Sequence, residues 1–172
     1  MSTFFIYGEK EIAYLKNSDT ALGSIIDEIG VIERPVISDL FTALVNSIVG
    51  QQISTKAMDT VWRRFEEKFT QITPKALNSV PIEEIQQCGM SMRKATYIKN
   101  VAAKTVDGEL NITELYTLPD DEVIKKLTAL HGIGIWTAEM ILIFCMQRPN
   151  IMSWRDLAIQ RGLRMLHHHK EI

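Results

Sequence analysis

Cysteine is scarce in this chain of 172 residues, which has only Cys88 and Cys145. Two cysteines so far apart form no metal-ligand pair, and an iron–sulfur cluster held by four cysteines is excluded within these residues. We expect both to be buried, reduced thiols, as in a cytosolic protein.

Long hydrophobic runs are also missing. The longest apolar stretch, near residues 140–146, is far shorter than the roughly 20 residues that cross a membrane. No basic start followed by an apolar run marks a signal peptide. We therefore expect no membrane partner.

Neither sign of charge dominates, since the net charge is −2. The charge is uneven, however: residues 1–30 hold two basic and five acidic side chains, and residues 145–172 hold five basic and two acidic ones. A locally basic end can contact phosphates while the whole chain stays acidic. Ordinary surface charge explains the pattern equally well, so charge alone leaves both interpretations open.

Strand patterns are nearly absent, because only residues 4–7 have strand character. Apolar residues instead recur three and four positions apart, as on one face of a helix. Helices are expected to begin at Ser38, Ser54, Thr73, Pro81, Ser91 and Pro119, with a last one near residues 157–166. Residues 134–147 are apolar nearly all round, which predicts a central buried helix. The fold class is therefore all-α.

We expect a two-lobed helical bundle with a cleft between the lobes. Residues 1–34 are expected to form N-terminal helices that pack with the C-terminal lobe. Residues 35–118 are expected to form a central helical lobe. Residues 119–172 are expected to hold a helical hairpin and the loop that follows it.

The most distinctive motif is Leu130-His131-Gly132-Ile133-Gly134, at the corner between two helices. Two glycines one residue apart suit such a corner, and Ile133 between them is expected to point into the core. Unpaired N–H groups at the start of the second helix then form an anion site with the helix dipole. A glycine pattern alone is equally typical of a plain corner in a helical bundle.

Together with three further segments, this corner resembles the helix-hairpin-helix DNA glycosylase superfamily, in its DNA-3-methyladenine glycosylase II branch. The resemblance covers about residues 35–166 and rests on Leu130–Ala138, Asp156-Leu157-Ala158-Ile159, Gly50-Gln51-Gln52-Ile53-Ser54 and Ser91-Met92-Arg93-Lys94-Ala95. It implies a monomeric base excision repair enzyme that flips alkylated purines out of damaged double-stranded DNA and removes them by hydrolysis. The expected location is then the cytoplasm with the bacterial nucleoid, or a eukaryotic nucleus.

In that family, an aspartate at the position of Asp156 carries out the chemistry. A carboxylate near C1′ stabilises a sugar with oxocarbenium character and orients or deprotonates the attacking water. Its place before Leu157 is equally typical of a helix cap.

Bifunctional members carry a lysine where this chain has Trp136, so the resemblance implies a monofunctional glycosylase with no lyase step. Trp136 is expected to bind the flipped, positively charged base through its aromatic face. The plainer alternative is a core tryptophan.

The resemblance also implies contacts with DNA. Gln52 matches the wedge that enters the base stack, with Ile53 as a second contributor, although both also suit a plain polar helix end. The residues expected at the DNA backbone are Gly132, Gly134, Ile135, Thr137 and Arg93, of which Arg93 also suits a solvated face. No cofactor is expected beyond a structural sodium or potassium ion held by backbone carbonyls at Leu130 and Gly132.

The chain departs from the family at both ends. Its short acidic start cannot be the α/β domain of some relatives, and it ends at Ile172, where relatives usually continue with further helices. The expectation is either a C-terminally truncated chain or a minimal member. The early end favours an alternative function, a non-catalytic or degenerate helix-hairpin-helix protein that only binds DNA.

Overall fold

The computed structural model describes residues 4–170, and the all-α prediction is confirmed over that part of the chain. The helices are α1 (Glu9–Ser18), α2 (Thr20–Ile29), α3 (Leu40–Gly50), α4 (Thr55–Lys68), α5 (Pro74–Ser79), α6 (Ile82–Gln86), α7 (Met92–Val106), α8 (Ile112–Leu115), α9 (Asp120–Thr128), α10 (Ile135–Phe144) and α11 (Leu157–Leu166). An isolated antiparallel bridge joins Phe4 to Pro35, where strand character was expected. Within residues 4–170, no helix is long and apolar enough to span a bilayer.

Polar caps begin three of these helices at the expected residues. The side chains of Ser54, Thr73 and Ser91 each accept a backbone N–H from the first turn of α4, α5 and α7. The prediction for α3 is wrong by one residue. Asp39 rather than Ser38 caps it, and its Oδ1 accepts the Thr42 N–H at 2.7 Å, since a carboxylate is the stronger acceptor.

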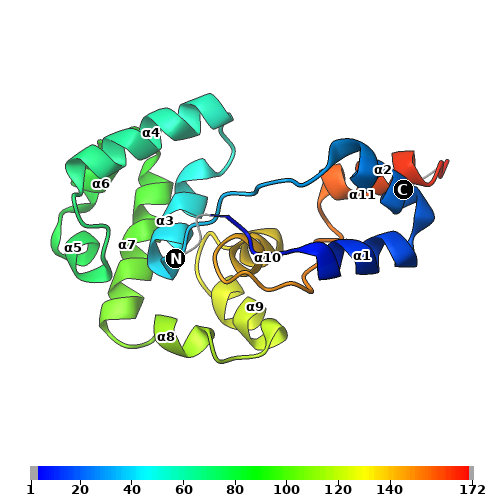
Figure 1. The fold of residues 1–172 in the computed structure, drawn as a ribbon. Coiled ribbons are helices and arrows are strands. Elements are labelled where there is room, and N and C mark those ends of the chain that lie inside the picture. Colours follow the sequence, from blue (N-terminus) through cyan, green and yellow to red (C-terminus); the bar gives the residue numbers. More distant parts are fainter. Residues whose placement is uncertain (1–3, 171–172) are drawn as a thin grey trace.

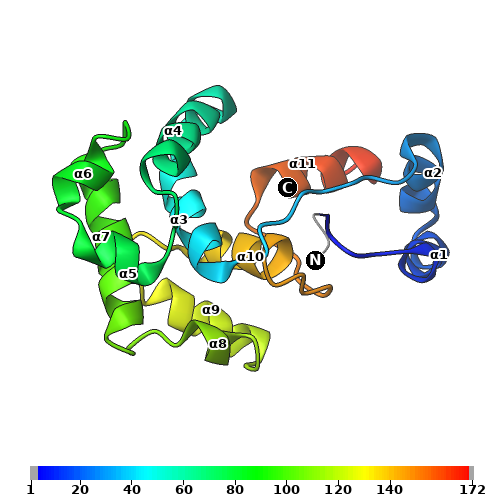
Figure 2. The ribbon, with the colours of Figure 1, turned by 60° about the vertical axis from the view of Figure 1, so that its left-hand side comes forward.

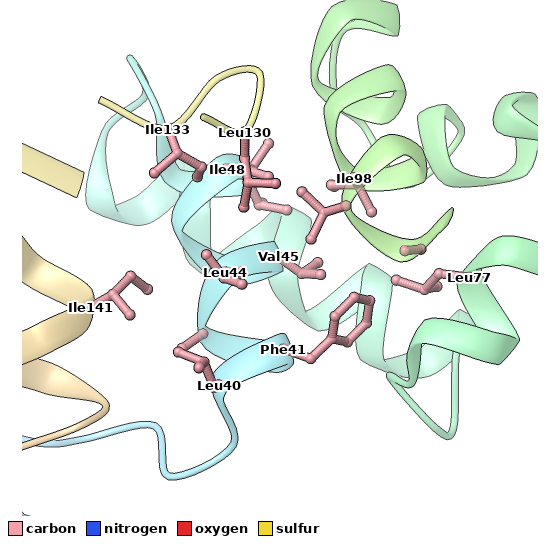
Figure 3. Packing of buried hydrophobic residues seen from close by; sticks show 14 of the residues in the cluster. Leu40, Phe41, Leu44, Val45, Ile48, Leu77, Ile98, Leu130, Ile133 and Ile141 are labelled. Carbon is pink, nitrogen blue, oxygen red and sulfur yellow. The ribbon is translucent and has the colours of Figure 1, made fainter. Parts of the chain in front are cut away.

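One buried hydrophobic cluster joins α3 through α10. Figure 3 shows α3 at its centre, with Leu44 and Val45 between Ile141 of α10 on one side and Ile98 of α7 on the other. Leu44, Val45 and Ile98 are fully excluded from solvent. Buried residues of α9 and α10 belong to the same cluster, so the core crosses the expected division between residues 118 and 119. The domain limits stay a prediction.

A second, smaller group of helices lies apart from this bundle. Figures 1 and 2 show α1, α2 and α11 together at one end of the molecule, although they come from opposite ends of the chain. His167, just after α11, lies 3.2 Å from the Asp19 carboxylate at the start of α2. The three helices bury no hydrophobic side chain. The hydrophobic stabilisation of the fold therefore lies mainly in α3–α10.

Candidate functional site

Two hydrophobic side chains attach the corner between α9 and α10 to the core. Leu130 and Ile133 are buried in the core cluster, where Figure 3 shows them near Ile48 of α3. The Ile133 N–H donates to the Leu130 carbonyl at 3.1 Å and closes the turn. The prediction that Ile133 points into the core is confirmed.

Gly132 is required at this corner for two separate reasons. Its φ of +88° lies in the left-handed region that side chains disfavour. A Cβ atom would also lie 2.3 Å from Cδ2 of Tyr97. The carbonyl of Gly132 accepts a hydrogen bond of 2.6 Å from Nε2 of Gln51. This bond joins the corner to the turn between α3 and α4, a connection that sequence analysis missed.

The start of α10 is open. Gly134 occupies the cap position with ordinary extended angles and provides no side-chain acceptor. A Cβ atom placed there would meet nothing within 4 Å. Within residues 4–170, the first-turn N–H groups of Ile135 and Trp136 have no hydrogen-bond acceptor, and both residues are exposed. These amides, at the positive end of the helix dipole, are free to bind an anion.

Asp156 uses both oxygens of its carboxylate. Oδ1 accepts the backbone N–H groups of Ala158 at 2.7 Å and Ile159 at 3.3 Å, so Asp156 caps α11. Oδ2 accepts the indole N–H of Trp136 at 2.7 Å. The Trp136 bond first, then the backbone bonds, hold the pKa of Asp156 below its usual 3.8. The carboxylate is therefore ionised at neutral pH and fixed in direction.

Trp136 also lines a cavity of about 450 Å³ between facing sides of α3 and α10. The walls are mostly apolar and include Met58, Met140 and Phe144. Three polar side chains in the wall, Asn46, Gln52 and Thr137, have no side-chain hydrogen bond within the described residues. An apolar pocket with a few free polar groups suits a small organic ligand. Neither Asn46 nor Met58 lies in a segment that sequence analysis singled out.

Thr137 is placed in this wall rather than at the outer surface of the corner, since only 7% of its surface is exposed. Its role in DNA binding stays a prediction.

Gln52 lies at the exposed tip of the turn between α3 and α4. Its φ of +55° is in the left-handed region, which costs a side-chain-bearing residue about 1–2 kcal/mol. Gln52 borders both the 450 Å³ cavity and a second one of about 350 Å³, whose walls include Ile53 and Arg93. The fold thus brings together Gln52, Ile53 and Arg93, which come from two separate motifs and were all expected to contact DNA.

Arg93 is exposed at the start of α7, whereas its neighbour Lys94 is engaged inside the fold. Lys94 Nζ donates to the Val49 carbonyl at 2.8 Å, near the end of α3. Burial lowers the pKa of Lys94. Of this basic pair, Arg93 is therefore the one available to a phosphate.

The two carbonyls expected to hold a monovalent cation each accept one hydrogen bond. The Leu130 carbonyl accepts the Ile133 N–H, and the Gly132 carbonyl accepts the Gln51 amide. A carbonyl oxygen keeps a second lone pair after one such bond, so each of the two can still accept a further partner. The cation site stays a prediction.

Comparison with known proteins identifies relatives in sequence and in fold. The profile of the HhH-GPD superfamily of base excision DNA repair proteins matches residues 45–172. DNA-3-methyladenine glycosylase 1 of Schizosaccharomyces pombe is 34% identical over 133 residues, covering 74% of this chain and 58% of its own length. The chain thus spans little more than half of this relative.

Solved structures of similar proteins share the fold. A DNA-3-methyladenine glycosidase from Bacillus halodurans superimposes with a TM-score of 0.84 and 35% identity, over 96% of this chain and 77% of the other. A 3-methyladenine DNA glycosylase from S. pombe, solved with abasic DNA, gives a TM-score of 0.80 and 30% identity, over 92% and 81% of the two chains.

Proposed function

We propose a DNA glycosylase function for this chain, which belongs to the HhH-GPD superfamily of base excision DNA repair proteins. The proposed substrates are alkylated purines of the 3-methyladenine type in double-stranded DNA. The observation that carries the proposal is an ionised carboxylate, Asp156, bonded to Trp136 in the wall of an apolar cavity. That cavity is proposed to take the flipped base.

The proposed reaction is hydrolysis of the bond between the base and C1′. An alkylated purine is already cationic, so it leaves as a neutral base when this bond breaks, and the sugar becomes an oxocarbenium-like cation. The fixed negative charge of Asp156 stabilises that cation. Water then adds to C1′ and releases one proton, directly or through Asp156, which leaves an abasic sugar.

The absence of a lyase step is part of the proposal. Lyase chemistry in this superfamily uses an amine nucleophile that forms a Schiff base at C1′, and Trp136 has no such amine at the corresponding position. Its indole N–H is bonded to Asp156 instead.

Backbone contacts are proposed to hold the duplex. The free N–H groups at the start of α10 suit a phosphate, and a sodium or potassium ion at the carbonyls of Leu130 and Gly132 would add positive charge beside it. Gln52 is proposed as the wedge that fills the space of the extruded base. None of these contacts reads a base sequence.

The test is release of free bases from methylated duplex DNA, separated by chromatography. We expect Asp156→Asn to lower the single-turnover rate by about 10²–10³, as for loss of one charge-stabilising group. Asparagine caps a helix about as well as aspartate, so the thermal midpoint should change little. Release at an unchanged rate by a folded Asp156→Asn protein would contradict the catalytic role.

The same reactions distinguish the alternatives. Borohydride should trap no protein–DNA adduct, and strands should stay intact until heated in alkali. A trapped adduct would refute the monofunctional assignment. Duplex binding without base release by the wild type would instead support a non-catalytic DNA-binding protein.

A further inference from the structure

The segment that carries Asp156 runs back along α10. It leaves the end of α10 near residue 145, yet its last residue, Asp156, is bonded to Trp136 in the first turn of that helix. In the middle of the segment lies Ser153, which is fully buried, while its neighbours Met152 and Trp154 are exposed. A buried serine between two exposed large side chains indicates that its hydroxyl is used.

The Ser153 hydroxyl donates to Oε2 of Glu139 on α10 at 2.5 Å. Glu139 lies three residues after Trp136, so the two side chains leave the same side of the helix. Ser153 likewise lies three residues before Asp156, and a hydrogen bond of 3.0 Å from the Asp156 N–H to the Ser153 carbonyl closes that turn. The bonds Trp136–Asp156 and Glu139–Ser153 therefore join α10 to the same segment, with a spacing of three residues on each side.

No other hydrogen bond among the described residues joins residues 149–156 to α10. The backbone bonds in this stretch are local, such as that from the Trp154 N–H to the Met152 carbonyl. With Trp136 alone, the segment would be attached to α10 only at the carboxylate itself. The Glu139–Ser153 bond adds a second attachment one turn away and so fixes the direction of approach.

We propose that Glu139 is a positioning residue for Asp156 and acts through the hydroxyl of Ser153. The inference rests on the proposed glycosylase function. A hydrogen bond from a buried hydroxyl to a carboxylate is charge-assisted and short, and loss of Glu139 leaves the fully buried Ser153 hydroxyl without its acceptor. A shift of about 1 Å in a reacting group costs roughly 10²-fold in rate.

The test compares Glu139→Ala, Ser153→Ala and Glu139→Gln with a control, Glu66→Ala. Glu66 is an exposed helical glutamate with no hydrogen bond or ion pair within the described residues. Single-turnover base release and affinity for an undamaged duplex are measured for each protein. We expect a rate 10- to 100-fold lower for both alanine variants at the Glu139–Ser153 pair, with affinity within threefold of wild type.

The conservative variant separates position from charge. The amide oxygen of Glu139→Gln accepts the Ser153 hydroxyl as the carboxylate does, so its rate should stay within about threefold of wild type. The double variant Glu139→Ala/Ser153→Ala should be no slower than the slower single variant, because the two residues act as a pair. A glutamine variant as slow as alanine, or alanine variants at the wild-type rate, would overturn the proposal.

A readout without turnover keeps this inference separate from the enzyme assignment. The indole N–H resonance of Trp136, identified by its loss in Trp136→Phe, reports the bond to Asp156. It should move toward the position of a solvent-exposed indole in Glu139→Ala and stay in place in Glu66→Ala. If wild type releases no base while this resonance moves, the glycosylase assignment fails and the positioning contact stands. An unmoved resonance refutes the positioning role.

Discussion

Asp156 combines two roles that its sequence context leaves as alternatives. It caps α11 through one oxygen and binds Trp136 through the other. The cap fixes the carboxylate relative to α11, and the indole fixes it relative to α10. The structural role therefore supports the proposed chemical one, because a carboxylate held at both oxygens keeps its direction while charge develops on the sugar.

Trp136→Phe tests the electrostatic part of this arrangement. Without the indole donor, the pKa of Asp156 should rise toward 3.8, since the largest cause of its lowering is removed. Because the folded-state pKa is lowered, the contribution of Asp156 to stability is present above its unfolded pKa and is lost as pH falls through the folded pKa. Between pH 5 and 8 this group should add no pH dependence.

The measurement is a ¹³C titration of the Asp156 carboxyl group from pH 2 to 6. Trp154→Phe is the matched control, since Trp154 is exposed and its indole makes no hydrogen bond within the described residues. It should leave the Asp156 titration unchanged. An equal pKa in wild type and Trp136→Phe would show that the bond does not hold in solution.

Predictability at this scale depends on how local a contact is. The caps at Ser54, Thr73 and Ser91 follow from short-range rules, as does the interpretation of Ile133 as a core residue. The bonds Gln51–Gly132 and Glu139–Ser153 join residues 81 and 14 positions apart. Such partners meet only through tertiary packing, which motif spacing does not encode.

Among the elements, the α9–α10 hairpin has two glycines that differ in backbone conformation and in the space around them. Gly132 has a positive φ and a tyrosine against it, whereas Gly134 has ordinary angles and open space. From the sequence, both glycines are expected at the DNA backbone. The structure assigns the steric requirement to the first and the open approach to the second.

Gly132→Ala should destabilise the fold by at least about 2 kcal/mol, from the left-handed backbone and the overlap with Tyr97. Gly134→Ala should cost less than about 1 kcal/mol, since only a cap preference changes. Urea unfolding followed by circular dichroism measures both. Equal losses would contradict the separate roles of the two glycines.

Gly134→Leu should weaken binding to any duplex by a similar factor, because a side chain there would occupy the approach to the free amides of α10. Fluorescence anisotropy with several unrelated duplexes checks this expectation. A loss confined to one sequence would contradict a backbone contact.

Element lengths show where periodicity is informative. The long amphipathic helices and the apolar α10 are recognisable from their spacing. α8, only four residues long, is too short to show a helical period and was missed. α9 ends at Thr128, and Leu130 belongs to the turn that follows, where its carbonyl accepts the Ile133 N–H.

At the level of the whole molecule, burial is divided unevenly between the two groups of helices. The core cluster lies in α3–α10, while α1, α2 and α11 bury no hydrophobic side chain. The all-α class follows from sequence because periodicity is local. The apolar character of α10 likewise predicts that it is buried, but the helices against which α9 and α10 pack do not follow from sequence, because they depend on which faces meet in space.

Hydrogen exchange should show this division directly. Amides of α1, α2 and α11 should exchange through local opening at lower free energy than those of α3 and α7, since few buried contacts hold them. Mass spectrometry of deuterated peptides measures the difference, with α7 as the internal reference. Equal protection in α11 and α7 would refute the prediction.

The backbone of Gln52 bears on how this protein could evolve. Gln147 also has a positive φ, but its side chain accepts the Ile6 N–H at 2.9 Å, whereas Gln52 has no side-chain hydrogen bond within the described residues. Replacement by glycine would relieve strain of about 1 kcal/mol in the free protein. Selection for thermal tolerance alone would therefore favour Gln52→Gly. That change would remove the wedge proposed at Gln52, so the proposed function predicts a trade-off between stability and base release at this turn.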